Sequence, residues 1–273
     1  YDGRAWRVQA PPPASRSATF NAVFAASASA VWIVGSTGTA LRWDGARFNP
    51  ADLPPGHGGD DLLAVTGAGP DEVWVVGDRG TALRYSAGAF SEAATGTQVT
   101  LRAAWASGRD DLWLAGDGGV VLQRSGALSF QRDSTLSTAR PLYALWGAGT
   151  GAAQDLWAAG AGGTLWRRSG GAWRAVASNT TADLTALFGR SAQEVYALGP
   201  PGGGVLRFDG ERWALEPSGT GEDTLIHALT SSGGSGDALW LVGGSGAVWQ
   251  KAPSRGFQRD LPAATTRHLT GLF

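Results

Sequence analysis

The sequence predicts an all-β protein, a β-propeller of seven four-stranded blades, and three observations lead to this fold class. Short apolar runs with high β-propensity recur with a period of about 41 residues along the whole chain. Each period holds four such runs, separated by Gly-rich steps that are typical of tight turns. No long stretch has the 3.6-residue periodicity of an amphipathic helix. A four-stranded blade cannot bury both of its faces alone, so we expect the repeats to stack radially.

The composition fits a single β-propeller domain that spans residues 1–273. The chain of 273 residues is 43% hydrophobic, and all-β proteins of this size often form one unit. Its net charge of −1 argues against nucleic acid as a partner, because domains that bind nucleic acid normally carry a basic excess. The apolar runs are far shorter than a membrane span, so we expect no membrane insertion. The absence of Cys excludes disulfides and thiol catalysis.

The first strand of each repeat is an apolar run such as "FNAVF", "LYALW" or "LTALF". These runs are 39 to 43 positions apart and begin near Phe20, Leu62, Leu101, Leu142, Leu184, Ile226 and Leu269. The second strand reads "VWIVG", "VWVVG" or "LWLAG", and the third reads "TALRW" or "GVLRF". The fourth strand carries an aromatic residue, as in "RFNP" and "RWALE". The order of the four runs therefore predicts one antiparallel blade in each repeat.

The steps between these runs contain the residues that two-residue hairpins require. "GSTG", "GDRG" and "GDGG" separate second from third strands, and the pairs Asp44-Gly45 and Asp209-Gly210 separate third from fourth strands. The central residues of such turns need a positive φ, which glycine adopts at no steric cost. The turn residues thus agree with the strand pattern.

The two ends of the chain resemble parts of a repeat and predict a seventh, split blade. "YDGRAWRVQ" at the N-terminus matches "WDGARFNPA" at residues 43–51, where a third strand ends and a fourth follows. Residues 269–273 match a first strand, with Phe273 at the position of Phe24, where that strand ends. We therefore expect residues 269–273 and 1–10 to form the last blade and to close the ring, which removes exposed sheet edges. The middle strands of this blade are missing, so we expect the polypeptide to continue upstream of Tyr1. Eight or more blades are the alternative.

The repeat resembles those of a known group of propellers. "DEVWVVGDRGTALRY" at residues 71–85 is similar to the BNR-like repeats of bacterial surface and secreted proteins, and to those of Ycf48-like photosystem II assembly factors. The resemblance implies an extracellular, cell-surface or periplasmic protein. It says little about activity, because such propellers serve as scaffolds, lectins and sialidase-type hydrolases. "RYSAGAF" and "RRSGGAW" lack the Asp of the sialidase-type Asp-box, so no property of that box is inferred.

Two positions carry similar residues in most repeats, and we interpret both as structural. An aromatic residue recurs in the second strand, where it is expected to pack between neighbouring blades rather than to stack on sugars. Its members are Trp32, Trp74, Trp113, Trp157, Tyr196 and Trp240. An arginine recurs in the third strand, as Arg42, Arg84, Arg167 and Arg207. We expect it to pair with nearby carboxylates, namely Asp71, Asp110, Asp155 and Glu194. A clamp for an anionic ligand is the alternative.

Other positions differ from blade to blade, and these are the candidate ligand-binding residues. They lie at or just before the start of the first strand, which places them near the rim of the central channel, where ligands of propellers often bind. The candidates are Asn21, Asp61, Arg102, Tyr143, Asp183, Thr185, His227 and His268. The alternative is that a wet channel mouth accepts any polar residue. Two histidines without a third ligand do not make a metal site, and we expect neither metal nor cofactor.

The predicted function is a non-catalytic binding or scaffold module that mediates protein–protein interaction. No Ser/His/Asp arrangement, phosphate-binding loop or Cys/His spacing is present in the sequence, so we do not expect an enzyme. The alternative is a glycan-binding lectin or a sialidase-like glycoside hydrolase that acts at the channel mouth. In that case Asp61 and Asp183 would be the carboxylates available as an acid/base pair.

Overall fold

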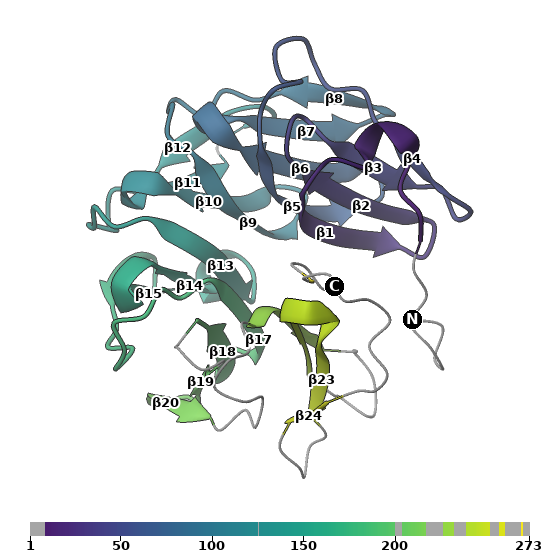
Figure 1. Cartoon of the computed structure of the whole chain (residues 1–273). Coiled ribbons are helices and arrows are strands. Elements are labelled where there is room, and N and C mark those ends of the chain that lie inside the picture. Colours follow the sequence, from purple (N-terminus) through teal and green to yellow (C-terminus); the bar gives the residue numbers. More distant parts are fainter. Residues whose placement is uncertain are drawn as a thin grey trace.

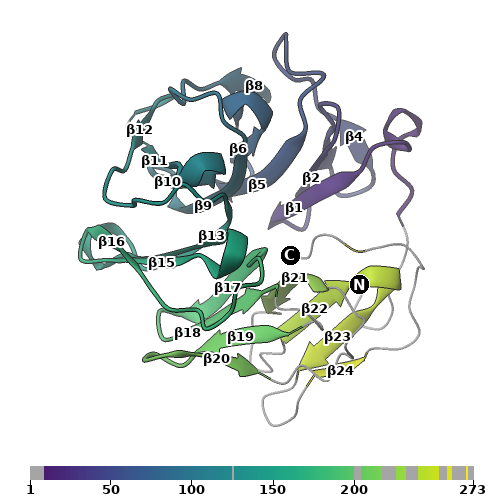
Figure 2. The ribbon, with the colours of Figure 1, turned by 60° about the vertical axis from the view of Figure 1, so that its left-hand side comes forward.

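The computed structural model is a β-propeller, and it describes residues 9–124, 126–199, 204–216, 226–231, 239–251, 257–259 and 269. These residues form six four-stranded antiparallel sheets, each a blade whose strands follow one another in sequence order. The blades surround a common centre (Figures 1 and 2), and the innermost strands of consecutive blades pack side by side. The all-β propeller prediction is confirmed.

The strands follow the repeat of the sequence. The first three blades comprise β1 (Phe20–Ser27), β2 (Ala30–Gly35), β3 (Ala40–Trp43) and β4 (Phe48–Pro50); β5 (Leu62–Gly69), β6 (Glu72–Gly77), β7 (Ala82–Ser86) and β8 (Ala89–Glu92); and β9 (Leu101–Gly108), β10 (Asp111–Gly116), β11 (Val121–Arg124) and β12 (Phe130–Arg132). The last three comprise β13 (Leu142–Ala148), β14 (Asp155–Gly160), β15 (Leu165–Ser169) and β16 (Ala172–Ala175); β17 (Ala186–Ser191), β18 (Glu194–Leu198), β19 (Val205–Phe208) and β20 (Trp213–Glu216); and β21 (Ile226–Ser231), β22 (Leu239–Gly243), β23 (Val248–Lys251) and β24 (Phe257–Arg259).

The number of blades differs from the prediction. Seven blades with a split last one is wrong, because the described residues form six four-stranded blades. The count of seven rested on two terminal runs that resemble an inner and an outer strand. A blade also needs the two middle strands, because they supply the hydrogen-bond partners of the inner and outer strands. Of the expected split blade, only residues 9, 10 and 269 lie in the described part, and none of them is in a strand.

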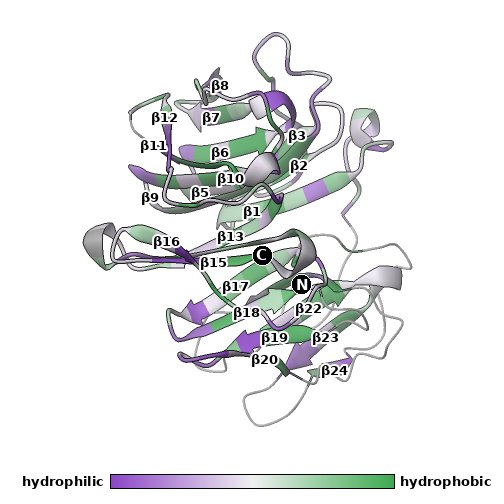
Figure 3. Ribbon diagram, turned by 90° about the vertical axis from the view of Figure 1, so that its left-hand side faces the viewer, coloured by the Kyte–Doolittle hydropathy of each residue, from purple (hydrophilic) through white to green (hydrophobic). Residues whose placement is uncertain are grey.

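The core lies between blades as well as within them. The second-strand aromatics Trp32, Trp74, Trp113, Trp157 and Tyr196 are at most 1% exposed, which confirms their structural interpretation, whereas Trp240 is half-buried. Trp32 of the first blade packs edge-on against Tyr85 of the second, with ring centroids 4.5 Å apart. Such pairs add about 0.5–1.5 kcal/mol beyond the area that they bury. Apolar residues run along the strands, while hydrophilic residues gather at strand ends and turns (Figure 3).

The turns between second and third strands have the predicted positive φ values, but four of the described ones are three-residue 3₁₀ turns rather than the predicted two-residue hairpins. In the turn of the second blade, Arg79 and Gly80 have φ values of 55° and 72°, and the amide of Thr81 donates to the carbonyl of Asp78 at 2.9 Å. Asp78–Gly80 is labelled η2, and the same kind of turn recurs as η3 (Asp117–Gly119), η5 (Ala161–Gly163) and η6 (Gly244–Gly246). Short 3₁₀ turns also occur at η1 (Pro13–Ser15) and η4 (Gly151–Ala153).

In the described part of the chain, the loops that join successive blades lie on one face of the propeller, and we call it the mouth face. It consists of the second-to-third-strand turns (36–39, 78–81, 117–120, 161–164 and 244–247) and of the loops between blades (51–61, 93–100, 133–141 and 176–185). Both sets lie on one face because each inner strand begins opposite the end of the second strand, as Leu62 does opposite Gly77. No helix within the described ranges is long and apolar enough to cross a membrane.

Candidate functional site

The variable position at the channel mouth is the extra residue of a β-bulge. In the first blade, Phe20 pairs with Gly35 and Ala22 pairs with Val34, so Asn21 between them has no partner in the ladder. The same shift recurs at Leu63, Arg102, Tyr143 and His227. A bulge interrupts the ladder locally and redirects the side chain of its extra residue, and it is common beside active sites. The fold therefore allows this position to vary from blade to blade.

A glycine at the end of the second strand makes the bulge possible, as the second and third blades show. A Cβ added to Gly77 would lie 2.1 Å from the carbonyl oxygen of Asp61, and one added to Gly116 would lie 2.1 Å from that of Thr100. The same carbonyl of Asp61 accepts the amide of Asp78 at 3.0 Å. The inner strand thus approaches the second strand too closely for any side chain. This contact fixes where the mouth residues begin.

Arg102 and Tyr143 are brought together at the mouth from neighbouring blades. Arg102 on β9 lies over the ring of Tyr143 on β13, with 5.7 Å between the guanidinium carbon and the ring centroid. Its Nε and Nη2 donate to the two carboxylate oxygens of Asp117 at 2.6 and 3.0 Å. These hydrogen bonds raise the pKa of Arg102 above its already high usual value, so the side chain stays charged. Arg102 is 37% exposed and Tyr143 is half-buried, so both are within reach of a ligand.

The two acidic candidates bind turns of the preceding blade. Asp61 Oδ1 accepts the amide of Thr37 at 3.0 Å, and Asp183 Oδ1 accepts the amide of Gly162 at 2.8 Å. Thr37 has a φ of 51°, a conformation that a β-branched residue rarely adopts, so the carboxylate stabilises a strained turn. Both residues therefore have a structural role that the sequence did not reveal, and it accounts for an acid at this position in two blades.

In the described part of the chain, no hydrogen bond, ion pair or ring contact joins the other predicted mouth residues to Arg102 or Tyr143. Asn21 Nδ2 donates to the carbonyl of Leu62 on the next inner strand at 2.9 Å. Thr185 is exposed, and its amide donates to the carbonyl of Leu198 at 2.8 Å. His227 is half-buried at the bulge of β21. His268 lies outside the described residues.

A cavity of about 550 Å³ between the first two blades was missed by sequence reasoning. It opens on the mouth face, between the loop that follows β4 and the loop that follows β8. His57 Nδ1 lies 2.9 Å from Asp60 Oδ2, and His57 Nε2 lies 3.5 Å from Glu92 Oε2. Asp60 is only 1% exposed and also accepts hydrogen bonds from Thr81 Oγ1 at 2.7 Å and from Arg79. The sequence signal is "GHGGDD" at residues 56–61, a His three positions before an Asp in a Gly-rich loop.

The cavity is suited to a polar ligand. Asp60 is fully engaged, and it orients the His57 ring so that Nε2 faces Glu92, whose side chain is largely exposed at the rim. The arrangement is a hydrogen-bonding surface with charges of both signs. Within the ranges that the structure describes, no group of three or more His, Asp or Glu residues is placed to hold a metal ion.

The third-strand arginines pair with acids of their own blades, as predicted for Arg84, Arg167 and Arg207. Arg84 Nη2 lies 2.6 Å from Glu72, Arg167 Nη2 lies 2.5 Å from Asp155, and Arg207 Nη2 lies 3.3 Å from Glu194. In the second blade the acid is Glu72 rather than the predicted Asp71, because the side chain of Glu72 points to the blade interface and is buried. Arg42 is the exception, since its blade has no acid at this position.

Comparisons with known proteins support the fold. No protein-family model matches the sequence, and no curated protein matches it. Among solved structures, YCF48 bound to a D1 peptide is 17% identical with a TM-score of 0.71, and the match covers 91% of this chain and 82% of that one. YCF48 from Cyanidioschyzon merolae is 16% identical with a TM-score of 0.70, covering 95% and 89%.

Two other propellers are similarly close in structure. The WD40 repeats of RRP9 are 12% identical with a TM-score of 0.77, covering 97% of this chain and 88% of that one. Virginiamycin B lyase from Staphylococcus aureus, in an inactive form with quinupristin, is 13% identical with a TM-score of 0.71, covering 89% and 84%. These likenesses confirm a Ycf48-like β-propeller fold. Their identities are too low to carry an activity to this chain.

Proposed function

We propose that this β-propeller is a non-catalytic scaffold that binds a protein partner at its mouth face, with a peptide segment seated beside Arg102 and Tyr143. The contact between these two side chains carries the proposal. Arginine and tyrosine are among the residues that contribute most to protein interfaces. Here they stand on bulges of a rigid sheet, so little conformational entropy is lost when a partner binds.

The charges at this site favour a peptide over a small anion. Asp117 occupies Nε and Nη2 of Arg102, which leaves the other terminal nitrogen to donate to a backbone carbonyl. The ring of Tyr143 provides a flat apolar surface with a hydroxyl at its end. A site of one arginine, its own carboxylate and a tyrosine is close to neutral. Its affinity would come from shape and hydrogen bonds.

Three further observations support parts of this proposal: a protein partner, a non-catalytic role and export. One solved structure of the same fold contains a bound D1 peptide, and another is a WD40 repeat protein. Asp61 and Asp183 are engaged in turns, which weakens the case for an acid/base pair. Some structures of this fold are extracellular domains of Bacteroides thetaiotaomicron proteins, in line with an exported protein.

A pull-down from native extract tests this function. The wild-type protein should recover a stoichiometric protein partner, and the double variant Arg102→Ala, Tyr143→Ala should lose it. Arg212→Ala is the matched control, because Arg212 is a highly exposed arginine on the face opposite the mouth. Recovery of no partner, or equal recovery by the double variant, would contradict the proposal.

The polar cavity favours glycan recognition or hydrolysis as a second candidate function. Its volume of about 550 Å³ fits a small ligand, and His57, Glu92 and Arg79 supply groups that hydrogen-bond sugar hydroxyls. A glycan array and a panel of glycosidase substrates test it. A signal that is lost in His57→Ala supports this candidate, and the absence of any signal removes it.

A further inference from the structure

An acid that is buried or half-buried recurs two residues before the aromatic of the second strand, and we call its place the carboxylate position. It is occupied by Glu72, Asp111, Asp155 and Glu194 in the second to fifth blades. The first blade has Ala30 instead. In the sixth blade the place falls on residue 238, outside the described residues.

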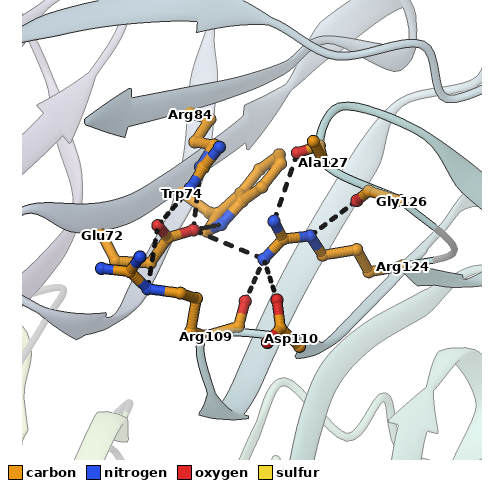
Figure 4. Close-up of polar contacts among 8 residues, drawn as sticks. All are labelled: Glu72, Trp74, Arg84, Arg109, Asp110, Arg124, Gly126 and Ala127. Atoms are coloured by element: carbon orange, nitrogen blue, oxygen red, sulfur yellow. Dashed lines mark hydrogen bonds and ion pairs between the residues drawn. The ribbon is translucent and has the colours of Figure 1, made fainter. Parts of the chain in front are cut away.

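In the second blade the acid satisfies the polar groups around it, as Figure 4 shows for Glu72, whereas in the fourth blade Asp155 binds Arg167 and leaves Trp157 Nε1 without a partner. Glu72 is 3% exposed and accepts Trp74 Nε1 at 3.0 Å, together with Arg84 Nε at 2.9 Å and Nη2 at 2.6 Å. Arg124 of the next blade adds a contact at 3.4 Å. Burial alone would raise the pKa of Glu72, but the hydrogen bonds from Arg84 and Trp74 outweigh it, and the pKa lies below its usual value. Glu72 is therefore ionised and tightly bound.

The first blade keeps the donors and lacks the acid. Trp32 pairs with Arg42 across the strands as Trp74 pairs with Arg84, so the two blades have the same frame. Ala30 is 2% exposed and has no polar group to offer. Trp32 Nε1 and Arg42 Nε are buried without a hydrogen-bond partner, and no carboxylate of the described residues lies within ion-pair distance of Arg42. An unpaired buried donor of a charged group is costly, so the site favours an added acceptor.

Two aromatic rings hold the guanidinium of Arg42, while its Nε has no hydrogen-bond partner. Its guanidinium lies over the rings of Trp32 and Tyr85, at 5.9 and 5.6 Å from their centroids. A guanidinium that lies against aromatic rings still has N–H groups in its plane, where a carboxylate can bind. A cavity of about 360 Å³ borders these three side chains, between the outer halves of the first and second blades.

Two further acids line this cavity and restrict what it can accept. Asp44 accepts the amides of Ala46 and Arg47 and the side chain of Asn49, and these hydrogen bonds lower its pKa to about 2. Asp52 is exposed. Their negative charge repels multivalent anions such as phosphate. It suits a ligand that presents one carboxylate to Arg42 and a basic group to Asp52.

We propose that Arg42 and Trp32 form an open carboxylate-binding site, which takes a Glu or Asp side chain of a peptide that has a basic residue next to the acid. In the second blade, an acid of the chain itself pairs with the equivalent arginine and tryptophan. In the first blade, the acid of a bound peptide would take that place. It is separate from the mouth site and does not depend on it.

The first test introduces a carboxylate into the site by substitution of Ala30. Ala30→Glu should place a carboxylate where Glu72 stands in the second blade, and we expect it to raise the Tm by about 2–4 °C relative to the isosteric Ala30→Gln. The gain should vanish when Arg42→Gln is combined with each variant. An equal Tm for Ala30→Glu and Ala30→Gln, or a gain that survives without Arg42, would overturn the proposal.

The second test measures binding of defined probes. The peptide acetyl-Gly-Glu-Lys-Gly-amide should shift the NMR signal of the Trp32 indole N–H saturably, and the same peptide with Gln for Glu should bind at least tenfold more weakly. Binding should be lost in Ala30→Glu and Arg42→Gln but kept in Arg102→Ala, which separates this site from the mouth. Equal binding of both peptides, or binding that persists in Ala30→Glu, would refute it.

Discussion

The guanidinium of Arg102 lies 5.7 Å from the ring centroid of Tyr143, across the boundary between the third and fourth blades. Both side chains stand on β-bulges at the start of inner strands, and Asp117 fixes the arginine from its own blade. We therefore expect the two residues to act as a unit in partner binding. Tyr143→Leu should weaken binding at least tenfold, because it removes the ring under Arg102 and the contact with the partner.

A double-mutant cycle shows whether Arg102 and Tyr143 bind the partner cooperatively or independently. Arg102→Gln and Tyr143→Leu should be non-additive in binding free energy by about 1 kcal/mol. Both variants should keep the Tm of the wild type to within a few degrees, because neither residue is fully buried. Additive effects would mean that the two side chains act independently.

Glu72→Gln should destabilise the protein by about 3 kcal/mol, because it leaves the guanidinium of Arg84 without its buried counter-charge. Arg207→Gln is the matched control. Its ion pair with Glu194 is 3.3 Å long and more exposed, so its loss should cost no more than about 1 kcal/mol. Urea unfolding measures both, and equal losses would contradict the distinction between buried and exposed pairs.

Stability should also depend on pH through Glu72. Its pKa is lowered in the folded protein relative to about 4.3 for an unperturbed Glu, so the unfolded state binds a proton first as the pH falls. The contribution of Glu72 is complete above the unfolded pKa and is lost as the pH falls through the lower folded pKa. The decline in unfolding free energy between pH 5 and pH 3 should therefore be shallower in Glu72→Gln. Parallel declines would show that Glu72 does not contribute.

Gly116→Ala should destabilise the protein by at least about 2 kcal/mol, because its Cβ would lie 2.1 Å from the carbonyl oxygen of Thr100. Gly108 ends the inner strand of the same blade, and a Cβ there would meet nothing within 4 Å. Gly108→Ala should therefore change the unfolding free energy by no more than about 0.5 kcal/mol. A small effect at Gly116 would argue against the close approach that fixes the bulge.

The repeat made most of the fold predictable from sequence. The four strands, the positive-φ turns, and the packing of residues such as Trp113 follow from patterns within about forty residues. The blade count was wrong because each run at the two ends resembles one strand only. A run that resembles one strand does not predict the neighbouring strands with which it would form a blade. The bulges at Asn21 and Arg102 could not be predicted, because they depend on how closely a glycine lets two strands approach.

The site was predicted only in part. The variation at the inner-strand start was visible, and it includes the Arg102–Tyr143 pair. The structural use of Asp61 and Asp183 was hidden, because their partners lie on turns of the preceding blade. The cavity at His57 was missed for the same reason, since its walls come from loops some forty residues apart.

Photo-cross-linking from the mouth tests the central claim most directly. A benzoylphenylalanine would replace Tyr143, and in a second preparation it would replace Glu211, which is exposed in the turn opposite the mouth face. Irradiation in native extract should cross-link one protein from position 143 and not from position 211. Equal cross-linking from both positions, or none from position 143, would contradict a partner site at the channel mouth.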